Sequence, residues 1–227
     1  MTIPSPQPPL PYQDRSFQAF LFDMDGTLLT SIESAERVWS RWLRLHGLDP
    51  VAILPTIHGV QTIETITRLG IAGIDPRAEA AWIAREEMID LDGVRAIAGA
   101  AEFLGGLPDD GWAIVTSATR ALAEARLAAA GLTAPRLFIT AEDIANGKPA
   151  PDCYIAAARR LGKDVTQCAV FEDAPAGIAA GRAAGAPVVV ITDTHAHPVP
   201  TDYPQIRDYR GLTTVHDAGM IRLTSSR

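Results

Sequence analysis

The 227-residue sequence has only two cysteines, Cys153 and Cys168, and they lack the spacing of a metal-binding motif. No apolar run approaches the roughly 20 residues that a membrane-spanning helix needs. Basic side chains are outnumbered, with 20 Lys and Arg against 27 Asp and Glu, so the formal net charge is -7. This charge excludes a basic surface for nucleic acid or anionic lipid. The start lacks a basic region followed by an apolar stretch, so no signal peptide is expected. These absences favour a cytoplasmic protein with reduced, buried cysteines.

The amino terminus is rich in proline. Proline-rich sequence between Met1 and Pro11 predicts a disordered tail over residues 1–16. After it, residues 17–22 form a short, aromatic-rich apolar run that stops at Asp23. Such a run is typical of a buried strand, so we expect it to be the first strand of the core.

The segment 31–98 has helical patterning. At its start, apolar residues recur at helical spacing: Ile32, Ala35, Val38, Trp39, Trp42 and Leu45. Further helical stretches follow around 61–68 and 77–89. We expect Trp39 and Trp42 to belong to the core of this helical block, from which one of them could border a pocket.

Short β-rich runs alternate with helical segments in the rest of the chain. The expected strands cover 112–116, 137–139, 169–171 and 188–191, and the expected helices cover 120–130, 152–161 and 176–184. This alternation predicts an α/β protein with a doubly wound parallel sheet. The core would comprise 17–30 and 99–227, and the all-α segment 31–98 would be a cap inserted after the first strand.

Polar side chains fall at the ends of these strands. Asp23 and Asp25 close the first strand, Ser117 ends the second, Lys148 follows the third, and Glu172-Asp173 ends the fourth. The carboxyl ends of parallel strands lie on one edge of the sheet, where such proteins bind ligands. The sequence therefore predicts that these residues converge on one site.

Four motifs in order strengthen this prediction. They are Asp23-Met24-Asp25-Gly26-Thr27-Leu28, Val115-Thr116-Ser117, Gly147-Lys148-Pro149 and Phe171-Glu172-Asp173-Ala174-Pro175-Ala176-Gly177. Over residues 17–191 the chain resembles the haloacid dehalogenase-like superfamily, and within it the small-sugar and polyol phosphate phosphatases, with β-phosphoglucomutase as a relative. The resemblance implies a Rossmann-like core with a helical cap, and a phosphatase that forms an aspartyl-phosphate.

The resemblance also implies roles for the acidic residues. Asp23 would attack phosphorus, and Asp25 would protonate the departing alcohol and then deprotonate the attacking water. Mg²⁺ would be held by Asp23, the backbone carbonyl of Asp25, and Asp173. Glu172 would bind the metal directly or through a metal-bound water.

Other residues would bind the phosphoryl group. Ser117 and the Ala118 amide would hold phosphoryl oxygens, Thr116 is an alternative to Ser117, and Lys148 would contact the transferred group. The three negative charges of Asp23, Glu172 and Asp173 would balance the positive charges of Mg²⁺ and Lys148. A bound phosphate dianion would then give the site a net negative charge, which raises the pKa of Asp25 and favours its protonated form.

The substrate is expected to be a small sugar or polyol phosphate, and the protein a monomer. His58 and Gln61, near Glu64, form the most polar cluster of the cap and are candidates for binding substrate hydroxyls; a solvated loop is the alternative. In the mutase a cap histidine lies ten residues after the acid aspartate, where this chain has Ala35, which favours hydrolysis. A catalytically silent sugar-phosphate-binding regulator is the remaining alternative. His195 and His197 are expected to lie in a surface loop.

Overall fold

The computed structural model describes residues 10–194 and 201–225, and its centre is a parallel six-stranded sheet. The strands run in the order β6-β5-β2-β7-β8-β9, so β2, the first of them in the chain, lies in the middle. This is the doubly wound arrangement that the alternation of strands and helices predicted. The strands are β2 (Ala19–Phe22), β5 (Trp112–Val115), β6 (Phe138–Ile139), β7 (Cys168–Glu172), β8 (Val188–Ile191) and β9 (Gln205–Ile206).

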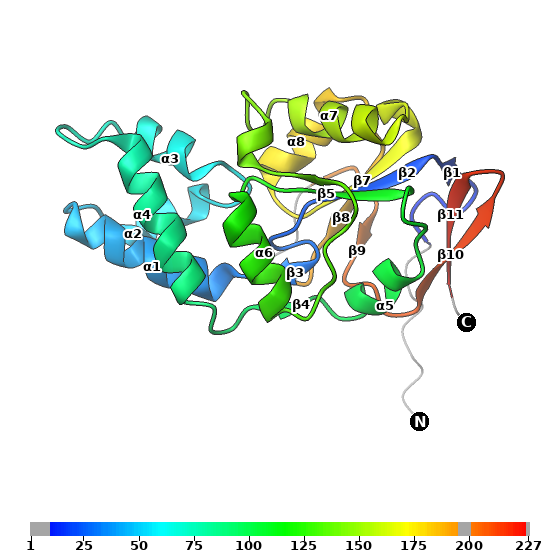
Figure 1. Cartoon of the computed structure of the whole chain (residues 1–227), viewed down its shortest axis with the longest axis horizontal. Helices are drawn as coiled ribbons and strands as arrows, with labels where there is room; N and C mark the ends of the chain where they lie inside the picture. The colour runs from blue at the N-terminus through cyan, green and yellow to red at the C-terminus, as the bar shows by residue number, and fades with distance from the viewer. Residues whose placement is uncertain (1–9, 195–200, 226–227) are drawn as a thin grey trace.

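Helices cover both faces of this sheet. On β2, Phe20 and Phe22 face a cluster that includes residues of α5 (Ala100–Gly105) and α6 (Arg120–Ala129). Ala19 and Leu21 face the opposite cluster, with residues of α7 (Asp152–Leu161) and α8 (Pro175–Ala183). Figure 1 shows these two helical layers above and below the strands. Burial on both faces explains why the strands are continuous apolar runs. Cys153 and Cys168 are free and buried in the second cluster, as expected.

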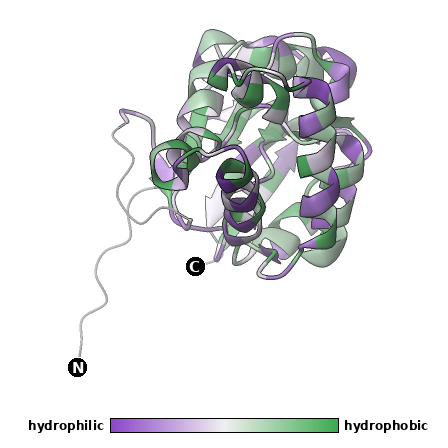
Figure 2. Cartoon of the chain, turned by 90° about the vertical axis from the view of Figure 1, so that its left-hand side faces the viewer, coloured by the Kyte–Doolittle hydropathy of each residue, from purple (hydrophilic) through white to green (hydrophobic). Residues whose placement is uncertain are grey.

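Four helices lie between the short strands β3 (Leu29–Thr30) and β4 (Arg95–Ala96), which pair with each other. They are α1 (Ile32–Leu45), α2 (Pro50–Ile53), α3 (Thr62–Leu69) and α4 (Pro76–Ile89). Trp39 and Trp42 belong to the buried cluster of this cap, as expected. Figure 2 faces the cap and shows hydrophobic and hydrophilic residues interspersed along its helices. In α1 the buried residues Ala35, Val38, Trp39 and Trp42 recur at helical spacing, which is an amphipathic pattern. Within residues 10–194 and 201–225 there are also three single 3₁₀ turns: Leu54–Thr56, Ala141–Asp143 and Val165–Gln167.

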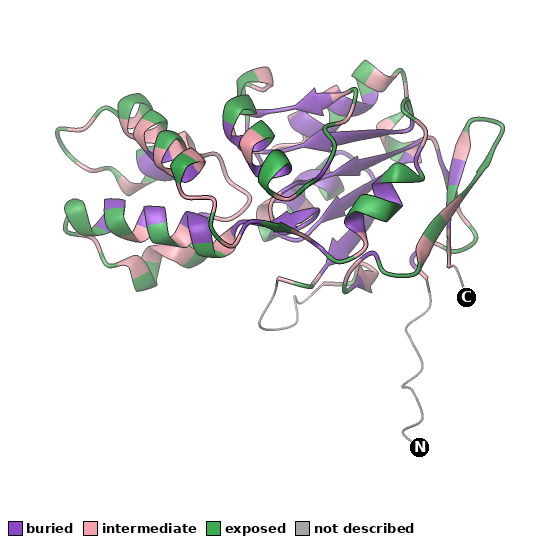
Figure 3. Ribbon diagram, turned by 60° about the horizontal axis from the view of Figure 1, so that its bottom comes forward, coloured by how far each residue is buried: buried purple, intermediate pink, exposed green. Residues whose placement is uncertain are grey.

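The sequence did not predict a second sheet, which lies at the other end of the core from the cap (Figure 1). It consists of β1 (Ser16–Phe17), β11 (Met220–Ser225) and β10 (Leu212–Asp217), all antiparallel. The expected single strand over 17–22 is therefore wrong at its start, because Phe17 pairs with β11 and only Ala19–Phe22 joins the large sheet. Figure 3 shows the burial of the large sheet beside the more exposed hairpin β10–β11.

The expected disordered tail over 1–16 is wrong at its carboxyl end. The Tyr12 hydroxyl donates to the carbonyl of Val188 at 3.2 Å, and Arg15 Nη2 donates to the carbonyl of Thr166 at 2.9 Å. These contacts hold the chain against the core before β1 begins. Residues 1–9, and the predicted surface loop with His195 and His197, lie outside the described residues. Among the helices described, none is both long and apolar enough to cross a membrane.

Candidate active site

The carboxyl ends of the central strands bring the predicted acidic residues together. Asp23 follows β2, and Glu172 and Asp173 lie at the end of β7, the strand beside it. One oxygen of each of the three carboxylates lies within 4.8 Å of the others, and all three side chains are buried. Lys148, from the loop between β6 and α7, completes the cluster. We call these four residues the sheet floor.

Lys148 is fully buried, and its ammonium group has three acceptors. Nζ donates to Asp23 Oδ1 at 2.6 Å, to Glu172 Oε1 at 2.8 Å and to the carbonyl of Val115 at 3.1 Å. An ammonium group has three N–H donors, so every donor is satisfied. Lys148 therefore fixes the position of Asp23 relative to β7.

Glu172 is held by the protein through both carboxylate oxygens. Oε1 accepts from Lys148 and from the hydroxyl of Tyr154 at 2.9 Å. Oε2 accepts from the backbone N–H groups of Asp173 at 2.8 Å and Ala174 at 3.0 Å. A side chain at Gly177 would overlap the carboxylate of Glu172, so α8 packs directly against it. These contacts make Glu172 a support for Lys148 and for the turn that carries Asp173.

Asp173 faces the turn after β2. The hydroxyl of Thr27 donates to its Oδ1 at 3.1 Å. Gly26, between Asp25 and Thr27, has a φ of +90°, and a Cβ there would overlap the carboxylate of Asp173. Glycine is therefore needed both for the backbone conformation and for the close approach of the two motifs.

The sheet floor carries excess negative charge. Burial raises the pKa of Asp23 to about 7, with Lys148 opposing the shift and Glu172 adding to it. Burial, Glu172 and Asp23 raise the pKa of Asp173 well above its usual range. Burial alone would lower the pKa of Lys148, but Asp23 and Glu172 raise it well above its usual value. Three carboxylates against one ammonium group, with hard oxygen donors close together, fit a divalent cation.

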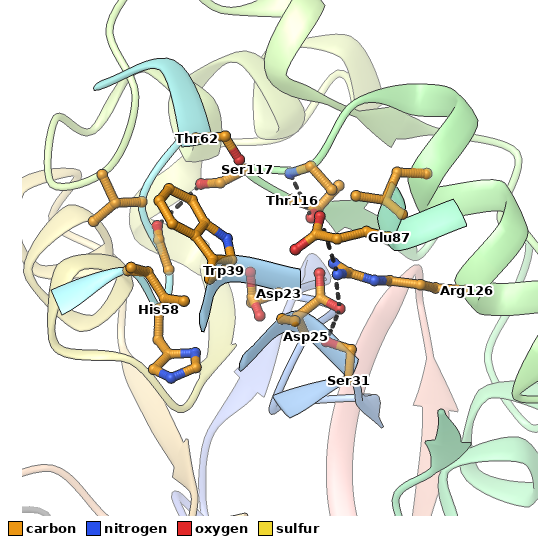
Figure 4. Close-up of a pocket in the computed structure, with 16 residues that line it drawn as sticks. Asp23, Asp25, Ser31, Trp39, His58, Thr62, Glu87, Thr116, Ser117 and Arg126 are labelled. Atoms are coloured by element: carbon orange, nitrogen blue, oxygen red, sulfur yellow. Dashed lines mark hydrogen bonds and ion pairs between the residues drawn. The ribbon is translucent and has the colours of Figure 1, made fainter. Parts of the chain in front are cut away.

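Asp25 lines a pocket between the core and the cap (Figure 4). Its side chain is half-buried, and Oδ1 accepts from the hydroxyl of Ser31 at 2.6 Å. Arg126 Nη1 lies 3.1 Å from the same oxygen. Asp23 and Asp25 both line this pocket, and so do Ala35, Trp39, Ile57, His58, Thr62, Glu87, Thr116, Ser117, Ala118, Leu122 and Arg126.

The residues after β5 lie at the pocket, but their hydroxyl groups differ. Thr116 is buried, and its Oγ1 accepts from the backbone N–H of Ala118 at 3.1 Å, which stabilises the turn. Ser117 is half-buried, and its Oγ donates to the carbonyl of Gly59 in the cap at 3.0 Å. Both residues line the pocket and both hydroxyl groups already have a partner, so the choice between Thr116 and Ser117 as the phosphate ligand stays open.

The polar residues of the cap, His58, Gln61 and Glu64, do not all lie at the pocket. His58 lines the pocket, with Nε2 3.4 Å from Glu36 Oε1. Gln61 is not among the lining residues; its Cγ lies close to Gly147 in the core. Glu64 Oε1 accepts from the backbone N–H of Gly147 at 3.1 Å. The expectation that Gln61 meets the substrate is not supported, because its side chain lies at the junction of cap and core.

Sequence reasoning missed two charged residues of the pocket. Arg126 lies on α6, which the sequence analysis gave only as an expected helix, and Glu87 lies on α4. Both are almost completely buried, and Arg126 Nη2 is 3.4 Å from Glu87 Oε2. In each helix the distinguishing feature is a charged residue at a buried position. Burial of a single helix position is known only from the tertiary structure, so the sequence alone could not identify either residue. The charge balance around Asp25 therefore includes a cation that the sequence analysis did not count.

Together, the fold and the site define an α/β protein with a doubly wound parallel sheet, whose acidic residues gather at the carboxyl ends of the strands. The chain belongs to the haloacid dehalogenase-like hydrolase family, whose model matches residues 17–185. The family resemblance drawn from the four motifs is thus confirmed.

Within this family, the chain is similar to curated phosphatases and to solved structures of hydrolases. The chain is 41% identical over 195 residues to hexitol phosphatase A of Escherichia coli (strain K12), covering 84% of this chain and 88% of the relative. It is 37% identical over 199 residues to 2-deoxyglucose-6-phosphate phosphatase 2 of Saccharomyces cerevisiae, covering 77% and 80%. A crystal structure of a hydrolase from Pseudomonas syringae superposes with a TM-score of 0.71 at 26% identity, covering 80% and 87%.

Proposed function

We propose that the protein is a Mg²⁺-dependent phosphatase that hydrolyses small sugar or polyol phosphates through an aspartyl-phosphate on Asp23. The observation that carries this proposal is the sheet floor, where Lys148 holds Asp23 beside two further carboxylates, directly below a pocket shared with the cap. The relatives named for hexitol phosphate and 2-deoxyglucose 6-phosphate support the substrate class.

In the first half-reaction, a carboxylate oxygen of Asp23 forms a bond to phosphorus while the bond from phosphorus to the ester oxygen breaks. Asp25 transfers its proton to the departing alcohol. In the second, water attacks phosphorus and gives a proton to Asp25, the acyl-phosphate bond breaks, and Asp23 is regenerated. Ser117, or Thr116 in its place, and the Ala118 amide would hold phosphoryl oxygens, with the substrate replacing the contacts that Ser117 makes to Gly59 and Ala118 makes to Thr116.

Asp23, Asp173 and the backbone carbonyl of Asp25 are the groups that would hold Mg²⁺. When bound, Mg²⁺ would offset the excess negative charge and polarise the phosphoryl group. Glu172 would position these ligands without binding the metal directly, because its two oxygens already accept hydrogen bonds from Lys148, Tyr154 and two backbone N–H groups.

A mutase and a silent binding protein are the alternatives. Ala35 lines the pocket where the resemblance to β-phosphoglucomutase would require a histidine, so hydrolysis is favoured over transfer to a second hydroxyl. All the residues to which we assign a role in phosphoryl transfer are present, which argues against a protein that binds sugar phosphates without hydrolysing them.

A screen of phosphate release in the presence of Mg²⁺ tests the proposal, with hexitol, hexose, deoxyhexose and glycerol phosphates as substrates. We expect release from at least one of these esters, with kcat/KM well above that for p-nitrophenyl phosphate. Tight binding of one ester without turnover of any would favour the silent regulator instead.

A further inference from the structure

Arg126 is a buried guanidinium group at the boundary between the core and the cap. It lies on α6, is 5% exposed and lines the pocket. Nη1 is 3.1 Å from Asp25 Oδ1, and Nη2 is 3.4 Å from Glu87 Oε2. Figure 4 shows the guanidinium group between these two carboxylates. The planar guanidinium group of arginine carries N–H donors on separate nitrogens and can contact two carboxylates at once. The ammonium group of lysine is a single compact charge and lacks this geometry.

The two carboxylates come from different parts of the chain. Asp25 follows β2 in the core, whereas Glu87 is in the last helix of the cap, α4. The bridge from Asp25 through Arg126 to Glu87 is therefore complete only while α4 packs against α6. The orientation of Asp25 and the position of the cap are linked through one side chain.

Ser31 provides a second link of the same kind. It occupies the N-cap position of α1 but makes no side-chain cap to the helix. Its hydroxyl donates instead to Asp25 Oδ1 at 2.6 Å. One oxygen of Asp25 is thus held by Arg126 from the core and by Ser31 from the entry to the cap.

Stability alone does not account for Arg126. Among the described residues, its Nε and Nη2 have no hydrogen-bond partner, although both atoms are buried. A buried guanidinium group with unsatisfied donors contributes less stability than one whose donors all have partners. Lys148, by contrast, satisfies all three of its donors.

We propose that Arg126 is a positioning residue, which orients Asp25 toward the leaving-group oxygen and, through Glu87, does so only when the cap is closed. This proposal rests on the function proposed above, because it needs Asp25 to be the acid that protonates the departing alcohol. Arg126 itself transfers no proton and forms no covalent bond.

The test compares phenyl phosphate with p-nitrophenyl phosphate, which have similar shapes but leaving groups of different basicity. The value of kcat/KM covers the steps up to departure of the alcohol, so the later hydrolysis step does not enter. Arg126→Met should lower kcat/KM for phenyl phosphate by on the order of 10-fold more than for p-nitrophenyl phosphate, because only the poorer leaving group needs the oriented acid. Arg126→Lys, which keeps the charge, should recover part of this difference.

Matched variants separate positioning from general damage. Glu87→Gln should give a smaller difference in the same direction, whereas Glu86→Gln, next to it on α4 and paired with Arg41 at the surface, should give none. Arg160→Met removes an arginine whose partner is the surface residue Asp143, and it should also give none. Thermal melting of each variant reports its fold.

Equal slowing of both esters by Arg126→Met and by Arg126→Lys would overturn the proposal, because a loosened cap or a damaged fold affects both esters alike. Asp25→Asn distinguishes this failure from failure of the proposed function. If Asp25→Asn slows phenyl phosphate selectively but the Arg126 variants do not, only the role of Arg126 is wrong. If Asp25→Asn slows the release of both alcohols equally in the first turnover, before the second half-reaction enters, the acid role of Asp25 is wrong, and the role of Arg126 fails with it.

Discussion

The two sides of the pocket are built differently. On the sheet floor, Lys148 and Glu172 have a partner for every donor and acceptor oxygen, and both side chains are buried. The opposite side of the pocket is formed by the cap residues Trp39, His58, Thr62 and Glu87, which we call the cap wall. Its ion pair to the core joins Glu87 to Arg126 Nη2 at 3.4 Å, and that nitrogen has no hydrogen-bond partner among the described residues.

This difference separates two tasks. Groups that meet the same phosphoryl group in every substrate can be fixed rigidly, because its geometry does not vary. In the proposed reaction, groups that meet the remainder of the substrate would lie on the cap, whose displacement relative to the sheet would admit the substrate and release the product. Changes on the sheet floor should therefore affect all substrates, and changes in the cap wall should affect some more than others.

The largest expected effect comes from Asp23→Asn. The variant keeps the size of the side chain but removes the nucleophilic carboxylate, so turnover of every ester should fall by on the order of 1000-fold or more. Phosphate release by the folded variant, verified by circular dichroism, is the measurement. Release at the normal rate would exclude Asp23 as the nucleophile.

Removal of the metal should affect all esters as strongly. EDTA should abolish phosphate release and added Mg²⁺ should restore it, because the carboxylates of the sheet floor otherwise repel a phosphate dianion. A panel of sugar, glycerol and aryl phosphates would show whether the loss is uniform. Full activity in excess chelator would contradict the proposed metal site.

Lys148→Met tests the sheet floor as a structural unit. It leaves Asp23 and Glu172 buried without their cation, so the free energy of unfolding should fall by about 3–5 kcal/mol, as for a broken buried ion pair. Urea denaturation in EDTA measures this change. Lys163→Met, at the chain's other lysine, is the control and should change stability little. Equal losses in the two variants would mean that the ion pairs of Lys148 are not what stabilises the floor.

The smallest and most selective effect is expected in the cap wall. His58→Ala should slow the best sugar or polyol phosphate by about 1–3 kcal/mol in activation free energy, the cost of one lost hydrogen bond to a buried polar group. It should change p-nitrophenyl phosphate little, because that ester offers no hydroxyl to bind. Arg68→Ala, on the exposed side of α3, is the control. If His58→Ala slows neither ester, His58 is only a loop residue beside Glu36.

The sheet floor could be predicted from sequence because it depends on local pattern. Each strand is a continuous apolar run that ends at a polar residue, and parallel strands place those ends on one edge. The hairpin β10–β11 was missed for the opposite reason: it is exposed along much of its length, so its residues lack a continuous apolar run.

The cap wall could not be predicted in the same way. Glu86 and Glu87 are adjacent and chemically identical, yet Glu86 pairs with Arg41 at the surface, whereas Glu87 lies in the pocket near Arg126. Likewise, polarity selected both His58 and Gln61, but only His58 lines the pocket. Which face of a helix meets another segment is decided by packing between distant parts of the chain. The expectation that the protein is a monomer stays a prediction.

The central claim is that Asp23 is phosphorylated and that Asp25 serves both half-reactions. The most direct test mixes Asp25→Asn with p-nitrophenyl phosphate and Mg²⁺, because this leaving group departs without an acid while the second step still needs the base. We predict a burst of p-nitrophenolate equal to the amount of enzyme, followed by a stall, with one phosphoryl group on the peptide that contains Asp23 by mass spectrometry. A stall without a burst, or a phosphoryl group on any other residue, would contradict the account.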